Sequence, residues 1–134
     1  MGLFKWLFGE VEIEREHFEE TEEYKKLQEE DKKLGVWMKR NERAYELEQA
    51  KEFNKAIKLY RKNIDMNYDG VRPFNRLAII YRKLKDIDSE ISILKEGIKV
   101  FSSFNDDPEY RDMTKEIDML NKRLQKAIAI KNKN

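Results

Sequence analysis

Two stretches of this chain repeat one pattern of apolar and small residues: residues 44–64, AYELEQAKEFNKAIKLYRKNI, and residues 78–98, AIIYRKLKDIDSEISILKEGI. The second begins 34 residues after the first, so that Ala44 aligns with Ala78 and Ile57 with Ile91. The other aligned pairs are Leu47 with Tyr81, Ala50 with Leu84, Phe53 with Ile87, Tyr60 with Leu94, and Ile64 with Ile98. A repeat of this period is typical of solenoids built from pairs of helices, and the pattern predicts two helical hairpins over residues 44–101.

Turn residues predict where these helices begin and end. Gly35 is expected to break a polar helix over residues 14–34, and a helix over residues 37–50 follows it. The next helix is expected over residues 53–66, before the turn-forming run Asn67-Tyr68-Asp69-Gly70. Pro73 suits the first turn of a helix that ends near Leu84.

The second half of the chain is expected to hold two further helices. Asp86 or Asp88 caps the first, which runs to Phe101. Asp107 and Pro108 predict the start of one long amphipathic helix that covers the end of the repeat. The apolar residues of this helix recur at steps of three and four: Tyr110, Met113, Ile117, Leu120, Leu124 and Ile128. We therefore predict a single all-α domain over residues 1–134. Its parts are residues 1–34, an apolar segment and acidic helix; 35–68, the first repeat; 69–104, the second repeat; and 105–134, a capping helix.

Composition narrows the class of protein. Charged residues make up 41% and apolar residues 40% of the 134, a balance typical of helical bundles and solenoids. The absence of cysteine excludes disulfides, thiolate metal sites and cysteine nucleophiles. No apolar run approaches the roughly 20 residues that cross a bilayer. A cytoplasmic protein is the default expectation.

The formal net charge of +1 hides a separation of charge along the chain. Residues 10–31 contain eleven acidic and three basic residues, a local charge of −8, so the rest of the chain carries +9. No acidic residue follows Asp118, whereas these basic residues do: Lys122, Arg123, Lys126, Lys131 and Lys133. Our first interpretation is a polar helix face with a basic tail. The alternatives are that acidic and basic regions meet, within the chain or between two copies, or, last in order, that the chain binds nucleic acid.

The N-terminus carries a short apolar segment. Its apolar residues are Leu3, Phe4, Trp6, Leu7 and Phe8. Read as a helix, the segment is apolar around most of its circumference, which favours a docked element over a free one. It docks on the domain or on a second copy, or it enters a membrane surface. The acidic residues that follow oppose the membrane alternative, because anionic lipid repels them.

The second hairpin resembles a tetratricopeptide repeat. Phe74, Leu77, Ala78 and Tyr81 have the family's spacing in the first helix, and in the first hairpin Ala56 and Tyr60 match its second helix. The chain departs from the pattern at these residues: Arg40, Arg43, Tyr68, Glu90 and Ser102. The resemblance implies a short right-handed solenoid of helical hairpins with capping helices at both ends. A plain four- or five-helix bundle is the alternative.

The resemblance also implies a function, a non-catalytic module that binds a peptide or protein segment on its concave face. The residues that would face this groove are Asn41, Tyr45, Glu48, Asn75, Ile79 and Arg82. Asn side chains there would bond the backbone of an extended peptide, and Arg82 would hold a carboxylate. The alternative function is a self-associating or peripheral membrane protein that uses the apolar N-terminal segment or the helix from Tyr110 to Ile128.

Catalysis and metal binding have little support in the sequence. His17 is the single histidine, and the glutamates around it are ordinary neighbours on a helix. There is no glycine-rich phosphate loop and no paired-histidine zinc motif. We expect no enzyme activity, no metal and no cofactor.

Overall fold

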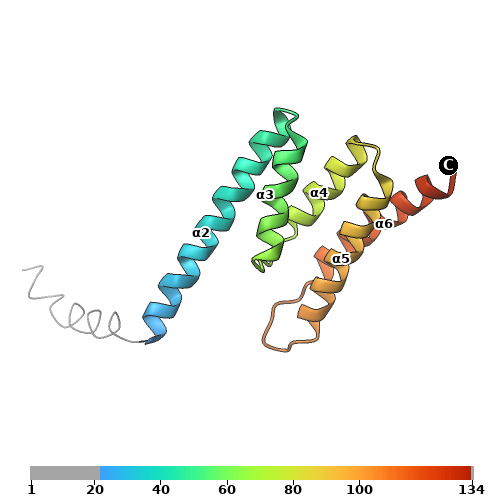
Figure 1. The fold of residues 1–134 in the computed structure, drawn as a ribbon. Coiled ribbons are helices and arrows are strands. Elements are labelled where there is room, and N and C mark those ends of the chain that lie inside the picture. Colours follow the sequence, from blue (N-terminus) through green and yellow to red (C-terminus); the bar gives the residue numbers. More distant parts are fainter. Residues whose placement is uncertain (1–21, 134) are drawn as a thin grey trace, which may run out of the picture. The chain divides into compact units, whose positions relative to one another are not determined.

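The computed structural model describes residues 22–133 (Figure 1). The chain divides into two compact units, Met1–Trp37 and Met38–Asn134. The apolar segment Leu3–Phe8 and His17 lie outside the described residues, so the predictions made for them stay predictions. The described residues of the first unit are all helical.

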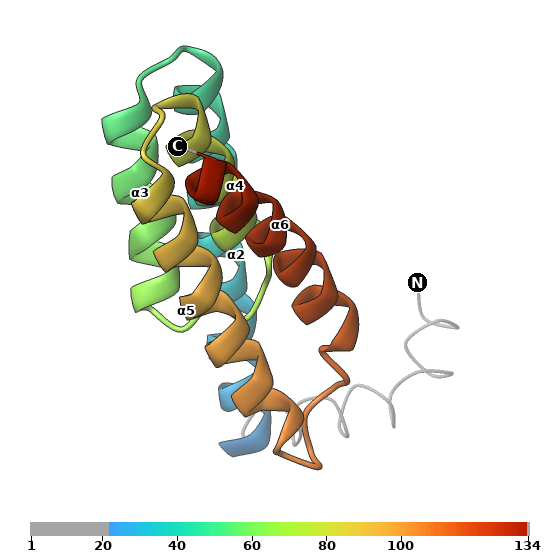
Figure 2. The same cartoon turned by 90° about the vertical axis from the view of Figure 1, so that its right-hand side faces the viewer.

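The described residues form helices and contain no strand, which confirms the all-α class. The helices follow one another along the chain as in Figure 1: α2 Glu22–Gln49, α3 Phe53–Asp65, α4 Arg72–Lys83, α5 Ile87–Asn105 and α6 Thr114–Lys133. In the second unit, α4 packs against α3 and α5, and α5 packs against α6. Figure 2 shows α5 between α3 and α6 in the view, with α4 behind it.

The two turns that close the repeated hairpins are copies of each other. Lys51 and Lys85 lie 34 residues apart, and both have left-handed backbone, with φ of 61° and 59°. The amide of Lys51 donates to the carbonyl of Glu48, and the amide of Lys85 donates to the carbonyl of Arg82, both at 3.0 Å. Their neighbours repeat as well, because Glu52 bonds to Leu47 as Asp86 bonds to Tyr81, both at 2.9 Å. The 34-residue period is therefore present in the backbone as well as in the sequence.

The core of the second unit is a continuous apolar cluster. Its large members, all fully buried, are Tyr60, Phe74, Leu77, Ile80, Leu94, Phe101, Met113 and Leu120. The rings of Phe74 and Phe101 meet edge to face, 5.5 Å apart. Small residues allow the helices to approach, and Ala44, Ala56 and Ala78 are buried.

Gly97 marks a close approach between helices. A Cβ atom at this position would lie 2.8 Å from a side-chain carbon of Leu120 on α6 and 3.0 Å from the ring of Phe74 on α4. Helix α5 therefore packs tightly against both neighbours at one point. The residue equivalent to Gly97 in the first repeat is Asn63, which is also fully buried.

The predicted break between two helices at Gly35 is wrong. The helix α2 continues through Gly35, where an added Cβ would contact nothing within 4 Å. One glycine inside a helix costs about 1 kcal/mol relative to alanine, and no proline or turn-forming run follows it to end the helix.

The last helix begins later than predicted, at Thr114 instead of near Asp107. Short polar side chains hold residues 107–113 outside the helix. Asp107 accepts from the amide of Glu109 at 2.9 Å, and Asn105 accepts from the amide of Met113 at 2.7 Å. Asp and Asn compete for backbone amides in this way, and so they favour turns over helix interiors.

Candidate binding surface

Two of the predicted groove residues, Asn41 and Glu48, are inside the domain. Asn41 is 2% exposed and its side-chain oxygen accepts from the amide of Asn63 at 2.7 Å. Arg40 donates to the side-chain oxygen of the same Asn63, also at 2.7 Å. These bonds join α2 to α3, so Asn41 serves the packing of the first hairpin, and the prediction that it faces a groove is corrected.

Glu48 is 1% exposed and is surrounded by donors. The guanidinium of Arg76 donates to both of its carboxylate oxygens, with Nε 3.0 Å from Oε1. The hydroxyl of Tyr60 donates to the same Oε1 at 3.2 Å. Burial raises the pKa of the Tyr60 hydroxyl, and the nearby charge of Glu48 raises it further. The carboxylate is satisfied inside the domain, so the prediction that it faces a groove is also corrected.

Tyr45 remains at the surface, with 39% of its area exposed. The guanidinium carbons of Arg76 and Arg72 lie 5.1 and 5.5 Å from the centre of its ring. Cations at this distance from an aromatic face are attracted to it. The ring therefore contacts two arginines of α4, the exposed Arg72 and the partly buried Arg76.

The three predicted residues of α4 lie on one face of that helix, at the helical spacing of Asn75, Ile79 and Arg82, and all are partly buried. Arg82 donates through Nε to the buried carboxylate of Glu90, at 2.8 and 3.0 Å. Its Nη2 atom is buried and has no hydrogen-bond partner in the described structure, and neither has the side-chain oxygen of Asn75. Buried polar atoms are usually paired, which makes these two a feature to explain.

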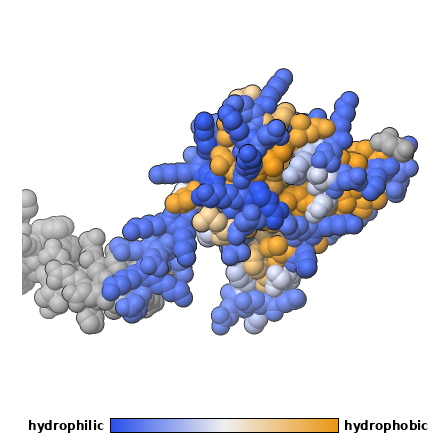
Figure 3. Space-filling model, viewed as in Figure 1, coloured by the Kyte–Doolittle hydropathy of each residue, from blue (hydrophilic) through white to orange (hydrophobic). Residues whose placement is uncertain are grey.

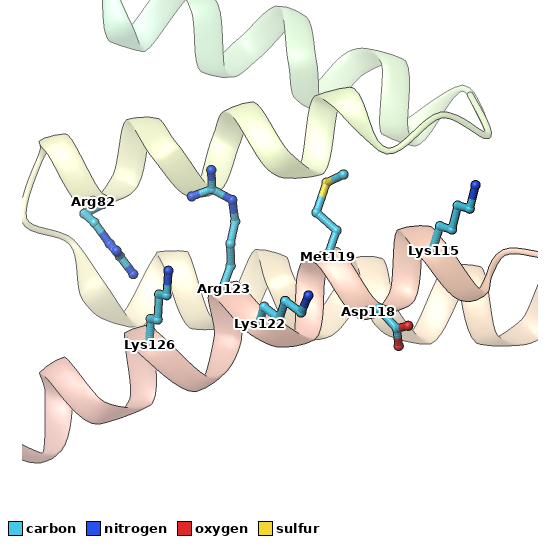
Figure 4. A pocket seen from close by; sticks show the side chains of 7 residues that line it. All are labelled: Arg82, Lys115, Asp118, Met119, Lys122, Arg123 and Lys126. Carbon is cyan, nitrogen blue, oxygen red and sulfur yellow. The ribbon is translucent and has the colours of Figure 1, made fainter.

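Arg82 also lines a cavity of about 570 Å³ between α4 and α6 (Figure 4). The other lining residues all belong to α6: Lys115, Asp118, Met119, Lys122, Arg123 and Lys126. Figure 4 shows Arg123 and Met119 extending from α6 toward α4, and Arg82 extending from α4 toward α6. Five cationic side chains thus line the cavity with one carboxylate. Asn75, Ile79 and these lining residues together are called the α4–α6 surface below.

Arg123, one of these cations, is partly buried. Burial lowers the pKa of its guanidinium, and the positive charges of Arg82 and Arg76 lower it further. Only Glu90 acts in the opposite direction. The protein thus places a cation where its own environment disfavours a positive charge, and a bound anion would relieve this.

The sequence analysis missed the α6 side of this surface. The signal was present, because Lys115, Lys122 and Lys126 follow the helical spacing of one face. We interpreted the lysines after Asp118 as a polar face and a basic tail. Nothing in the sequence alone placed that face opposite Arg82.

The rest of the surface is mixed in character. Figure 3 shows apolar patches among hydrophilic residues in the second unit, whereas the described residues of the first unit are mostly hydrophilic on the visible face. The apolar stripe predicted for self-association is covered, because Met113, Leu120 and Leu124 are buried in the core of their own chain. Only Met119 and Ile130 of α6 remain as large exposed apolar residues.

Comparison with known protein families, curated proteins and solved structures gives no match for this chain. None of the described helices is both long enough and apolar enough to span a membrane. Residues 22–133 also contain no group of three acidic or histidine side chains placed to hold a metal ion.

Proposed function

We propose that this protein is a non-catalytic interaction module, similar to a tetratricopeptide repeat, that binds a segment of another protein on its α4–α6 surface. The observation that carries the proposal is a pair of buried polar atoms on one face of α4, at Asn75 and Arg82, that have no hydrogen-bond partner among residues 22–133. An unsatisfied buried polar atom costs about 1–3 kcal/mol, which a ligand's hydrogen bonds would recover.

The chemistry of these positions suits a polypeptide. An amide such as Asn75 can accept from one backbone group of a bound segment and donate to another. Ile79 lies between Asn75 and Arg82 on the same face and offers an apolar contact. The 34-residue repeat of both the sequence and the closing turns supports a solenoid of two hairpins, an architecture that commonly binds proteins.

A library of random peptides selected against the full chain tests this function. The Ile79→Ala variant, with Asn75→Ala in the same chain, should bind the selected peptides about tenfold more weakly in calorimetry, since it removes contacts worth about 1.4 kcal/mol. The matched control is Ser92→Ala with Lys99→Ala, exposed positions on α5. Peptides that bind wild type, control and α4 variant equally would place the binding site elsewhere.

A further inference from the structure

We infer that the occupant of the α4–α6 cavity is an acidic segment of a partner protein, held along its length by carboxylates at internal positions. This inference rests on the proposed function, because it names the chemistry of the partner for the same surface. The charge and geometry of the cavity carry it.

The cavity has positive charge that the described structure leaves uncompensated. Arg82 is already paired with Glu90. Among the described residues, no carboxylate forms an ion pair with the other four cations of the cavity: Lys115, Lys122, Arg123 and Lys126. Asp118 is the single acidic residue in the lining. A ligand with several negative charges would therefore gain from every one of these cations.

The cations form a row along α6. Lys115, Lys122 and Lys126 are spaced by seven and four residues, which places them on one face and, for the last two, about 6 Å apart. Carboxylates on an extended chain recur on one side about every 7 Å. A row of this length suits several acidic side chains of one segment, and a single terminal carboxylate would engage only part of it.

Two further features point to an anion between Arg123 of α6 and Arg82 of α4. The Nη2 atom of Arg82 is a buried donor that finds no acceptor in the described part of the chain. Arg123 is half-buried beside Arg82, and its positive charge is disfavoured first by burial and then by that neighbour. A carboxylate between the two guanidiniums would accept from Arg82 and neutralise the repulsion, as arginine forks commonly do for planar anions.

The lining favours a polypeptide over a nucleic acid. Single-stranded nucleic acids are usually held by aromatic rings on which bases stack, and the cavity lining contains none. The apolar lining residue is Met119, and on α4 the same surface continues through Ile79 and Asn75. These residues match an apolar side chain and a peptide backbone.

The test uses the full chain and a short fluorescein-labelled peptide composed of Glu and Asp, acetylated and amidated at its ends. Fluorescence anisotropy should show binding that weakens as salt is added. Lys122→Glu combined with Lys126→Glu should weaken binding about tenfold or more, because both side chains are exposed and face the cavity. The matched control, Lys95→Glu with Lys99→Glu, makes the same change in net charge at the same spacing on α5 and should alter binding less than about twofold.

Equal losses in the two variants would overturn the inference, because they would reflect net charge alone. So would tighter binding of a single-stranded DNA of equal length, or binding that requires a free C-terminal carboxylate on the peptide. The library experiment distinguishes failure of this inference from failure of the proposed function. Selected neutral peptides whose binding depends on Ile79 would support the proposed function and contradict the acidic partner. Peptides whose binding depends on neither Ile79 nor Lys122 would contradict both the function and the acidic partner.

Discussion

Glu48 and Arg82 occupy the same position in the two repeats, 34 residues apart, immediately before turns with the same hydrogen bonds. Their charges are opposite, and so are their surroundings. Glu48 is buried and every partner that it needs comes from the domain, from Arg76 and Tyr60. Arg82 keeps one buried donor that has no partner among the described residues, and it faces a cavity. The same backbone thus builds a closed polar site in the first hairpin and an open one in the second.

This difference shows that two repeats with the same backbone can use their polar residues differently. The backbone period requires small or apolar residues at the helix contacts, and these are shared between the repeats. Some polar residues differ between the repeats, because Arg82 stands where the first repeat has Glu48 and Glu90 stands where it has Ala56. An acid at that position holds Arg82 at the edge of the α4–α6 cavity, so the departure from the repeat pattern helps to build the candidate site.

The largest expected effect on stability distinguishes the closed site at Glu48 from the open site at Arg82. Glu48→Ala leaves Arg76 and Tyr60 without their acceptor and should lower the free energy of unfolding by about 3–5 kcal/mol, as for other broken buried ion pairs. Glu90→Ala should cost less than half as much, because the side chain of Arg82 is 37% exposed and can turn to water. Urea denaturation of both variants gives the comparison. Equal losses would contradict the distinction between a closed and an open site.

A second prediction concerns the buried positions Gly97 and Asn63, which are also equivalent. Gly97→Ala should destabilise the domain by about 1–3 kcal/mol, because its Cβ would overlap Leu120 and Phe74. Asn63→Ala removes the bonds to Asn41 and Arg40. It should lower the free energy of unfolding by about 1–3 kcal/mol, because it leaves those polar groups unpaired. Thermal unfolding measures both. A neutral Gly97→Ala would show that α5 and α6 are not in tight contact there.

A third prediction tests whether the two closing turns carry the same backbone strain. Lys51→Gly and Lys85→Gly should each stabilise the protein by about 1 kcal/mol, because glycine adopts the left-handed backbone without the strain of a Cβ atom. The corresponding alanine variants serve as controls and should give no gain. Gains that differ by more than the measuring error would show that the two turns carry different strain.

The smallest expected effect on stability occurs only in alkaline solution. Burial and the hydrogen bond to Asp69 raise the pKa of the Tyr110 hydroxyl to about 12. The folded state therefore holds its proton more tightly than the unfolded state, whose pKa is near 10. This contribution to stability is complete below pH 10 and disappears as the pH rises toward 12. Tyr110→Phe should reduce the loss over that interval, and an unchanged pH profile would exclude the contribution of this hydroxyl.

Much of the fold could be predicted from the sequence because local signals agree with the packing there. The α3 and α4 helices follow from the spacing of apolar residues, and Asp86 caps α5 as expected by accepting from the amide of Ser89. The start of α6 could not be predicted in this way. Tyr110 bonds to Asp69, 41 residues away, and this long-range contact adds to the local bonds of Asp107 and Asn105 that hold residues 107–113 outside the helix.

The candidate site could be predicted only in part. The resemblance to a tetratricopeptide repeat predicted that Asn75 and Arg82 share one face of α4, and the helical spacing agrees with this. Glu48 and Asn41 were wrongly assigned to the groove, because the register gives no information on their long-range bonds to Arg76 and Asn63 inside the domain. The α6 side depends on how that helix crosses α4, and no residue spacing contains that information.

The most direct test of the central claim, that the second hairpin and α6 form the open binding site, is a map of where the acidic peptide binds. Nitrogen-15 labelled full chain is titrated with the peptide, and shifts are followed for the Arg82 and Arg123 Nε–H groups and for the Asn75 side-chain amide. The account predicts that these signals move together and saturate, while the Arg76 Nε–H, which is bonded to Glu48, stays nearly fixed. Shifts concentrated on α3 or on the outer residues of α5, with the Arg82 and Arg123 signals unmoved, would contradict it.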